Sequence, residues 1–182
     1  MKLYHIGKEV IKQPDSSVFL RKADFGKGFY LSNDRDFVVH LAKMFKEPVV
    51  YINVYELNTD DLKIKKLRKD KKWFKHIYFN RRNSKDIYED YDVVIGPIAN
   101  DVIFDKLGVI TSGVFNDQES LQLLKVGNSY TQVVIKTEKA LENLKWESVE
   151  EIREEEIKSF TEQTVKEEKK YQKKLADLIS KL

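Results

Sequence analysis

The chain has 182 residues, which is the size of one domain with an appendage, and 35 % of its residues are charged against 41 % that are hydrophobic. It has no cysteine, which excludes disulfides and thiolate chemistry, and its three histidines lack a ligand spacing, so we expect no metal site. The net charge of +3 is too small to indicate nucleic-acid binding by itself. Neither a signal peptide nor an apolar run of roughly 20 residues is present, and we therefore expect a cytoplasmic protein with no membrane association.

The first 60 residues contain the patterns of two strands and a helix. Residues 3–6 and 49–55 are rich in strand-forming residue types. Between them, Ser32 or Asn33 is a suitable helix cap, and Pro48 ends the helical pattern. The apolar residues that recur at helical spacing, and that we expect in the core, are Phe37, Leu41, Met44 and Phe45.

A basic stretch follows a mixed polar segment at residues 60–68. Residues 63–75 carry seven lysines and Arg68, and they also contain Trp73 and Phe74. Basic residues beside aromatic residues suit the phosphates and bases of a nucleic acid. The alternative is a solvated helix face with two aromatic side chains anchored in the core. Apolar residues at 73, 74, 77 and 78 predict a helix that ends near Asn80.

The next third of the chain alternates between predicted strands and helices. The apolar run at 91–98 predicts a buried central strand that Gly96-Pro97 ends. Asn100-Asp101 is a candidate cap for a helix over 102–107, although Asp101 also suits a polar position near a cleft. A helix is predicted within 114–124 and ends at Gly127-Asn128. A strand over 129–137 and a turn or short helix over 138–144 follow.

The composition changes at Trp146. Residues 147–182 are rich in glutamate and then in lysine, and they contain no glycine or proline. The apolar residues Tyr171, Leu175, Leu178 and Leu182 form a short heptad seam, which argues against disorder. We predict a domain over 1–145 and a charged helical extension over 146–182. That extension consists of one or two long helices that pack on the domain or on a partner, and it is the candidate element for self-association.

The stretch Asp24-Phe25-Gly26-Lys27-Gly28 predicts a glycine turn that leads into a strand over Phe29-Tyr30-Leu31. Strand alternation places Phe29 and Leu31 on one side and Tyr30 on the other. If the first two face the core, Tyr30 faces a cleft. The alternative is a simple hairpin turn with one amphipathic tyrosine at the surface.

Together with Tyr4-His5-Ile6-Gly7 in the first strand, the segment Gly26-Lys27-Gly28-Phe29-Tyr30-Leu31 resembles the ADP-ribosyltransferase superfamily. The similarity is to the branch of the poly-ADP-ribose polymerases and diphtheria toxin. The segments around Phe25 and Ile95 also resemble an uncharacterised bacterial family of that superfamily. This resemblance covers roughly residues 1–145. It implies an α+β fold with a split mixed or antiparallel sheet and a cleft, and NAD as co-substrate.

The resemblance also implies roles for three residues. His5 would bond a ribose hydroxyl in the adenosine half of NAD, and Tyr30 would stack on the nicotinamide ring. Gln132 stands where the superfamily usually has a catalytic glutamate. The glycine that normally follows the histidine is displaced by Ile6 to Gly7. The remaining residues that the resemblance places at NAD are Tyr4, Ile6, Gly7, Phe25, Gly26, Lys27, Gly28 and Phe37.

The glutamine has a chemical consequence, because cleavage of the nicotinamide–ribose bond develops positive charge on the ribose. Gln132 can still form a hydrogen bond, but it lacks the negative charge that stabilises the transition state by about 3–4 kcal/mol. The sequence thus predicts a slow or substrate-assisted transferase, one with a carboxylate supplied from elsewhere, or an inactive NAD-binding or partner-binding module. The implied acceptor is a protein or a nucleic acid. Family analogy adds a toxin held by an antitoxin, and the basic stretch leaves a nucleic-acid-binding protein as a further alternative.

Overall fold

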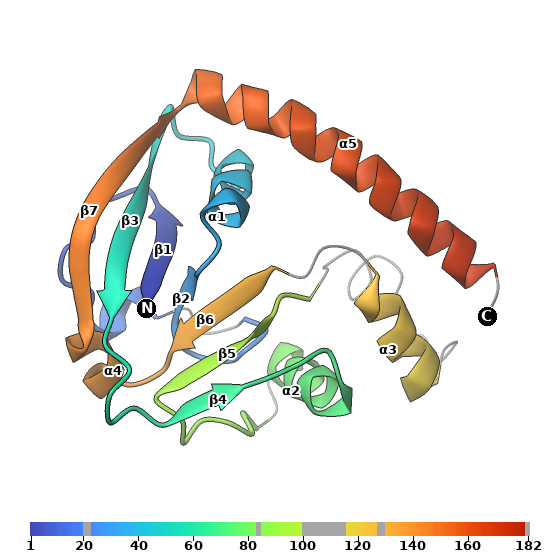
Figure 1. Cartoon of the computed structure of the whole chain (residues 1–182), viewed down its shortest axis with the longest axis horizontal. Coiled ribbons are helices and arrows are strands. Elements are labelled where there is room, and N and C mark those ends of the chain that lie inside the picture. Colours follow the sequence, from blue (N-terminus) through green and yellow to red (C-terminus); the bar gives the residue numbers. More distant parts are fainter. Residues whose placement is uncertain (20–22, 83–84, 100–115, 127–129, 181–182) are drawn as a thin grey trace.

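A computed structural model describes residues 1–19, 23–82, 85–99, 116–126 and 130–180, and it shows an α+β fold around one seven-stranded mixed sheet (Figure 1). The strand order is β4-β5-β6-β2-β1-β3-β7, with only β4 and β5 parallel to each other. The predicted α+β class is therefore confirmed. The strands are β1 (Lys2–Gly7), β2 (Phe29–Ser32), β3 (Val49–Leu57), β4 (Ile64–Lys66), β5 (Val93–Pro97), β6 (Thr131–Ile135) and β7 (Leu144–Arg153).

The sheet has a weak seam between β1 and β2. These neighbouring strands share a single register pair, Tyr4 with Ser32. In contrast, β1 pairs with β3 over its whole length, and β2 pairs with β6 over all four of its residues. The sheet thus consists of two well-paired halves, β1-β3-β7 and β2-β6-β5-β4, that run in different directions in Figure 1.

Helices cover the sheet, and most of them begin at a side-chain cap. Asp70 accepts hydrogen bonds from two backbone N–H groups at the start of α2, and Asn116 forms a capping box with Glu119 at the start of α3. The helices are the 3₁₀ turns η1 (Ser16–Val18) and η2 (Ala42–Met44) together with α1 (Arg35–Leu41), α2 (Lys71–Arg81), α3 (Asp117–Lys125), α4 (Glu138–Glu142) and α5 (Glu154–Ile179).

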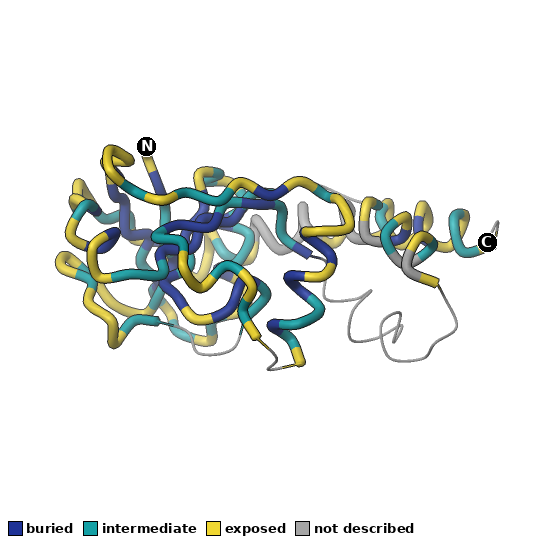
Figure 2. The backbone as a smooth tube through the Cα atoms, turned by 90° about the horizontal axis from the view of Figure 1, so that it is seen from below, coloured by how far each residue is buried: buried dark blue, intermediate teal, exposed yellow. Residues whose placement is uncertain are grey.

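Buried side chains form clusters on both faces of the sheet, and most buried residues lie in the part of the molecule away from the C-terminus (Figure 2). Leu3, Phe29, Leu31, Val133 and Ile135 pack together on one face. The other face is covered by α2, whose Trp73 and Ile77 join a second cluster, and by α1 in a third cluster. The predicted strands over 3–6, 29–31, 49–55, 91–98 and 129–137 and the helix ending near Asn80 are all confirmed within the described residues.

Three local predictions differ from the structure, and two others fall on residues that it does not describe. The cap of α1 is Asp34, not Ser32 or Asn33, because the Asp34 carboxylate accepts from the Phe37 N–H at 3.0 Å. Met44 is 72 % exposed, because the α-helix ends at Leu41 and the tighter turn η2 rotates that side chain outward. The mixed polar segment contains β4, which was not predicted. The predicted helix over 102–107 and the Gly127-Asn128 stop lie outside the described residues.

The C-terminal segment begins as a strand. Residues 147–153 form most of β7, which pairs with β3 at the edge of the sheet, so the helical prediction is wrong there. From Glu154 a single helix runs to Ile179, as predicted. Leu175 is buried in the same cluster as Leu123 and Trp73, with Tyr171 and Leu178 against it. The seam of α5 therefore packs on the domain itself.

Candidate functional site

The first candidate residue, His5, lies at the seam. Its Nδ1 is 2.9 Å from the backbone carbonyl oxygen of Tyr30, and its ring packs against Phe29 with 4.5 Å between centroids. A carbonyl oxygen only accepts hydrogen bonds, so Nδ1 carries the proton and Nε2 of the neutral ring is an acceptor. Burial lowers the pKa of His5, although the hydrogen bond to the Tyr30 carbonyl opposes this effect, and the neutral form is favoured. Nε2 makes no hydrogen bond to any described residue.

A small space lies beside Nε2 because residue 7 has no side chain. A Cβ built on Gly7 would lie 3.3 Å from Nε2 of His5, with nothing else but that ring within 4 Å. The displaced glycine of the first strand thus leaves one edge of the imidazole open to a ligand.

Tyr30 is held by the glycine turn that precedes it. Its hydroxyl donates to the Gly26 carbonyl at 2.6 Å and accepts from the Phe25 N–H at 3.0 Å. Burial raises the pKa of the phenol, with Asp24 and Asp86 adding to the effect against the hydrogen bond from Phe25. The ring is half-buried against the α2 side of the sheet. The two hydrogen bonds of its hydroxyl therefore fix the orientation of the ring.

Gln132 lies on β6, in register with Ser32 on one side and Gly96 on the other. It is 7 % exposed, and its amide nitrogen is buried without a hydrogen-bond partner among the described residues. Buried amide groups are rarely left unpaired, and each such group in a fold calls for an explanation. A ligand hydroxyl that accepts from this amide would supply one.

The three residues do not converge on a single hollow. Strand alternation places Gln132 and Tyr30 on the α2 side of the sheet, whereas the His5 ring lies against Phe29, which points to the opposite side. The link between His5 and Tyr30 runs through the strand backbone.

Other residues that the resemblance assigned to NAD have structural roles here. Phe25 is fully buried, and Ile6 is buried in the α1 cluster, against which Tyr4 and Phe37 also pack. Phe37 also stacks on Tyr130, with 4.7 Å between ring centroids. Lys27 is exposed, and its Nζ lies 5.8 Å from the centroid of the Phe19 ring.

A buried charge cluster beneath the glycine turn was not predicted from the sequence. The Lys136 ammonium group donates to the Asp86 carboxylate at 2.5 Å and to the Phe25 carbonyl at 2.6 Å. The Asp86 carboxylate also lies 3.7 Å from the His76 ring nitrogen Nδ1, and burial lowers the pKa of His76 to about 4. Lys136 directly follows β6, His76 lies in α2 and Asp86 lies in the loop between α2 and β5, so no short motif contains all three. We call them the charge cluster.

The glycine turn is shaped to fit the charge cluster. Gly26 has φ +80°, and a Cβ there would lie 2.1 Å from Oδ2 of Asp86. A Cβ on Gly28 would lie 2.6 Å from the carbonyl oxygen of Ile135 on β6. Both glycines of the motif are therefore required by packing, and the turn that carries Tyr30 is fixed by buried ion pairing.

Neither of two cavities is lined by His5, Tyr30, Gln132 or the charge cluster. One of about 730 Å³ is lined by the loop Lys12–Ser16, α4 and Trp146. A second of about 480 Å³ lies at the end of β1, between Ile6, Lys8 and the η2 segment with Met44 and Phe45. Within the described residues, no cluster of three histidines or carboxylates could hold a metal ion.

The helices of the described segments offer no membrane span, since none is both long enough and apolar enough to cross a bilayer. A comparison with curated proteins and with solved structures found no significant match. A family model described as "Protein of unknown function (DUF3990)" matches residues 1–146. The chain therefore belongs to the DUF3990 family, whose function its description leaves open.

Proposed function

We propose that the protein is an NAD-dependent ADP-ribosyltransferase of the cytoplasm that moves ADP-ribose to a macromolecular acceptor. One observation carries the proposal: His5 bridges the seam to the Tyr30 carbonyl and keeps a free acceptor nitrogen beside the open space at Gly7. The single register pair between β1 and β2 supports the split sheet that the resemblance implies. On family analogy alone, the proposal extends to a toxin held by an antitoxin.

The surroundings of His5, Tyr30 and Gln132 suit the role that we propose for each in NAD binding. The lone pair on Nε2 of the neutral His5 ring accepts a hydrogen bond from a ribose hydroxyl in the adenosine half of NAD. The Tyr30 ring, fixed by its bonds to Gly26 and Phe25, presents a face to the cationic nicotinamide. The unpaired amide of Gln132 fits a hydroxyl of the nicotinamide ribose.

In the proposed reaction, a nucleophile of the acceptor forms a bond to the ribose carbon C1′. The bond from that carbon to nicotinamide breaks, nicotinamide leaves as a neutral molecule with the electron pair, and the proton of the nucleophile passes to solvent. A glutamine at position 132 contributes a hydrogen bond but no negative charge to this step. A deficit of about 3–4 kcal/mol corresponds to roughly 100- to 1,000-fold slower turnover than with a carboxylate.

The glutamine also favours a second function, an NAD-binding module without turnover. In that case the Gln132 amide binds NAD, and no carboxylate stabilises the positive charge that develops on the ribose in the transition state. Comparison of binding with turnover separates this module from a slow transferase.

The test uses the full chain, NAD labelled in the adenosine half, and a cognate cell extract. Nicotinamide release and label transfer are followed, and NAD affinity is measured by calorimetry. We expect slow release from the wild type and at least 10-fold faster release from Gln132→Glu. Binding without release in both proteins would select the NAD-binding module, and no binding at millimolar NAD would refute both functions.

Gly7→Ala is the matched binding variant. Its methyl group would occupy the space beside Nε2 of His5 at 3.3 Å, while no positive φ is needed at this glycine. We expect loss of NAD affinity with a change in stability below about 1 kcal/mol. Unchanged affinity for NAD in Gly7→Ala would show that the His5 edge is not the ligand contact.

A further inference from the structure

Positive charge is strongly segregated in this chain. Residues 63–85 contain eleven lysines and arginines and a single acidic residue, Asp70. Because the whole chain carries a net charge of +3, the other 159 residues together carry a net charge of −7. The basic segment forms β4, at one edge of the sheet, and α2, which follows it.

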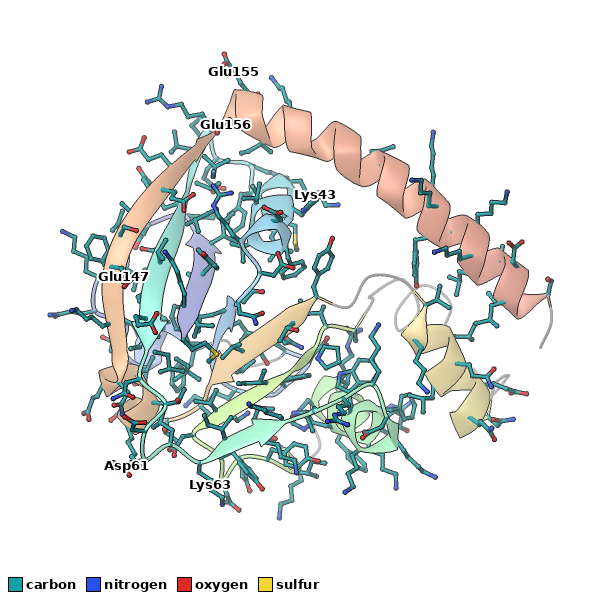
Figure 3. The ribbon with its side chains drawn as sticks, viewed as in Figure 1. Lys43, Asp61, Lys63, Glu147, Glu155 and Glu156 are labelled. Atoms are coloured by element: carbon teal, nitrogen blue, oxygen red, sulfur yellow. The ribbon has the colours of Figure 1, made fainter. Side chains whose placement is uncertain are left out.

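The opposite edge of the sheet is acidic. Figure 3 shows Lys63 beside β4, whereas Glu147 lies along β7 and Glu155 and Glu156 lie at the start of α5. The strands β4 and β7 are the two ends of the strand order. The charges are thus separated in space as well as in sequence.

Several lysines of β4 and α2 are not neutralised by a carboxylate among the described residues. The carboxylate of Asp70 accepts from the backbone N–H groups of Lys72 and Trp73 at 2.9 and 3.0 Å, so it caps the helix. Lys66, Lys72 and Lys75 are exposed and form no ion pair with any described residue.

The lysines at the start of α2 also oppose the helix dipole. The first turn of α2 contains no acidic residue, and Lys71 and Lys72 lie at its positive end. Each such charge costs about 0.3–1 kcal/mol at an exposed site. The Asp70 carboxylate at the cap offsets part of this cost, and an anionic partner at the same end would offset more.

Aromatic rings accompany the exposed cations. Lys71, Lys75, Tyr78 and Arg82 follow one stripe of α2, opposite the buried Trp73. The Arg82 guanidinium lies 4.8 Å from the centroid of the Tyr78 ring. On the β4 side, Nζ of Lys65 lies 4.9 Å from the Tyr88 ring. Half-exposed rings next to cations can stack on bases while the cations meet phosphates.

We propose that β4 and α2 form a binding surface for the phosphate backbone of a nucleic acid. We call it the basic surface, and it consists of the exposed residues Lys63, Arg68, Lys71, Lys72, Lys75 and Arg82. A bilayer is the poorer partner, because the only aliphatic side chain of α2, Ile77, is fully buried. This surface does not depend on the proposed transferase function. If both hold, a nucleic acid is the class of acceptor.

The basic surface lies next to the candidate site. The side-chain amide of Asn80 on α2 donates to the Asp24 carbonyl at 3.2 Å, and Arg81 forms an ion pair with the Asp24 carboxylate. Asp24 begins the turn that holds Tyr30. The C-terminal end of α2 therefore contacts the turn that holds Tyr30.

The test is fluorescence anisotropy of the full chain with labelled 20-nucleotide single-stranded RNA, single-stranded DNA and duplex DNA. We expect binding at 50 mM salt. With about five phosphate contacts, a single strand should lose roughly 100-fold in affinity by 200 mM salt. Comparison of the affinities for the three probes shows whether the surface prefers RNA, single-stranded DNA or duplex DNA.

Two double variants with the same change in net charge locate the surface. Lys72→Glu/Lys75→Glu changes α2, and Lys43→Glu/Lys46→Glu changes the exposed η2 region beside α1 (Figure 3). We expect at least a 30-fold loss of affinity for the α2 variant and less than a 3-fold loss for the control, both with wild-type melting temperatures.

The proposal is overturned if the wild type binds none of the three probes at 50 mM salt, or if both variants lose affinity equally. It is also overturned if a polyglutamate peptide of equal charge binds as tightly, since the partner would then be an acidic protein. Nicotinamide release is measured in separate reactions, so failure of the transferase function leaves these results unaffected.

Discussion

Replacement of Lys136 by methionine tests whether the charge cluster holds the glycine turn. The Lys136 side chain is only 4 % exposed, and its ammonium group donates to the Asp86 carboxylate and to the Phe25 carbonyl. Methionine has a similar length and an apolar end, so the change removes the charge and both hydrogen bonds with little loss of volume.

The expected loss of folding stability depends on the Asp86 carboxylate, which loses its main partner in this variant. The Asp86 carboxylate is 15 % exposed and would keep only the Tyr88 N–H at 3.0 Å and the more distant His76 ring. Removal of one partner from a buried ion pair costs about 3–5 kcal/mol, because the other charge remains unpaired. Some solvent reaches Asp86, and we therefore expect a loss near the lower end, about 3 kcal/mol.

The assay is urea unfolding followed by circular dichroism at pH 7. Lys139→Met, three residues further along, is the matched control, because its exposed ammonium group contacts only the Asp61 carbonyl. We expect the control to cost less than about 0.5 kcal/mol. The double variant Lys136→Met/Asp86→Asn should cost less than the sum of the single changes, since the unpaired charge is absent.

A second measurement reports on the cluster directly. Lys136 lowers the pKa of His76 through its charge, while Asp86 raises it. In Lys136→Met the His76 resonances should therefore titrate at higher pH than in the wild type. A loss of stability below about 1 kcal/mol together with an unchanged His76 titration would refute the assignment of a buried ion pair at this turn.

Three further predictions concern the same framework. Gly26→Ala should cost about 2–4 kcal/mol in urea unfolding, because of its φ of +80° and the Asp86 oxygen 2.1 Å from the new Cβ; an Ala variant of wild-type stability would contradict this. Burial depresses the pKa of His76 from 6.5 to about 4, so the unfolded chain takes up a proton on this ring at higher pH than the folded protein does. The free energy of unfolding should therefore be unaffected above pH 6.5 and should fall by up to about 3 kcal/mol as the pH decreases toward 4. The test measures the urea midpoint of the wild type and of His76→Leu between pH 7.5 and 4. Identical dependence of the midpoint on pH in the two proteins would count against this effect of His76. Arg35→Ala should cost less than about 1 kcal/mol in thermal unfolding, because the Arg35–Glu150 pair is more than a third exposed.

The sequence alone was sufficient for the strands and helices whose patterns are local. Residues 49–55 and 91–98 have strand composition, and residues 73–80 have a helical period that matches the buried face of α2. The turn before Tyr30 followed from its two glycines. These elements are specified by residues next to one another in the chain.

Two strands escaped prediction because distant pairing determines them. Strand β4 is three residues long and is formed by parallel pairing with β5. In β7 a register shift opposite Val54 and Tyr55 interrupts the alternation, so Trp146 and Val149 reach the same face three residues apart. This spacing imitates a helical period and, with many glutamates around it, favours the wrong element.

Contacts between residues far apart in the sequence also limited the prediction of the candidate site. Its motif residues were visible in the sequence, whereas the charge cluster joins residues 76, 86 and 136, which have no periodic or motif relation to one another. Ion pairing of this kind depends on the packing of α2 against β6, and only the fold brings those side chains together.

The structure separates the motif residues that folding needs from those that it does not. Gly26 and Gly28 are required by Asp86 and Ile135, and the Tyr30 hydroxyl is occupied by the turn, so packing alone accounts for these residues. Nε2 of His5 and the amide nitrogen of Gln132 make no hydrogen bond within the described residues. A buried amide without a partner costs about 1–3 kcal/mol. These two polar groups, rather than the glycine motif, therefore support the proposed ligand.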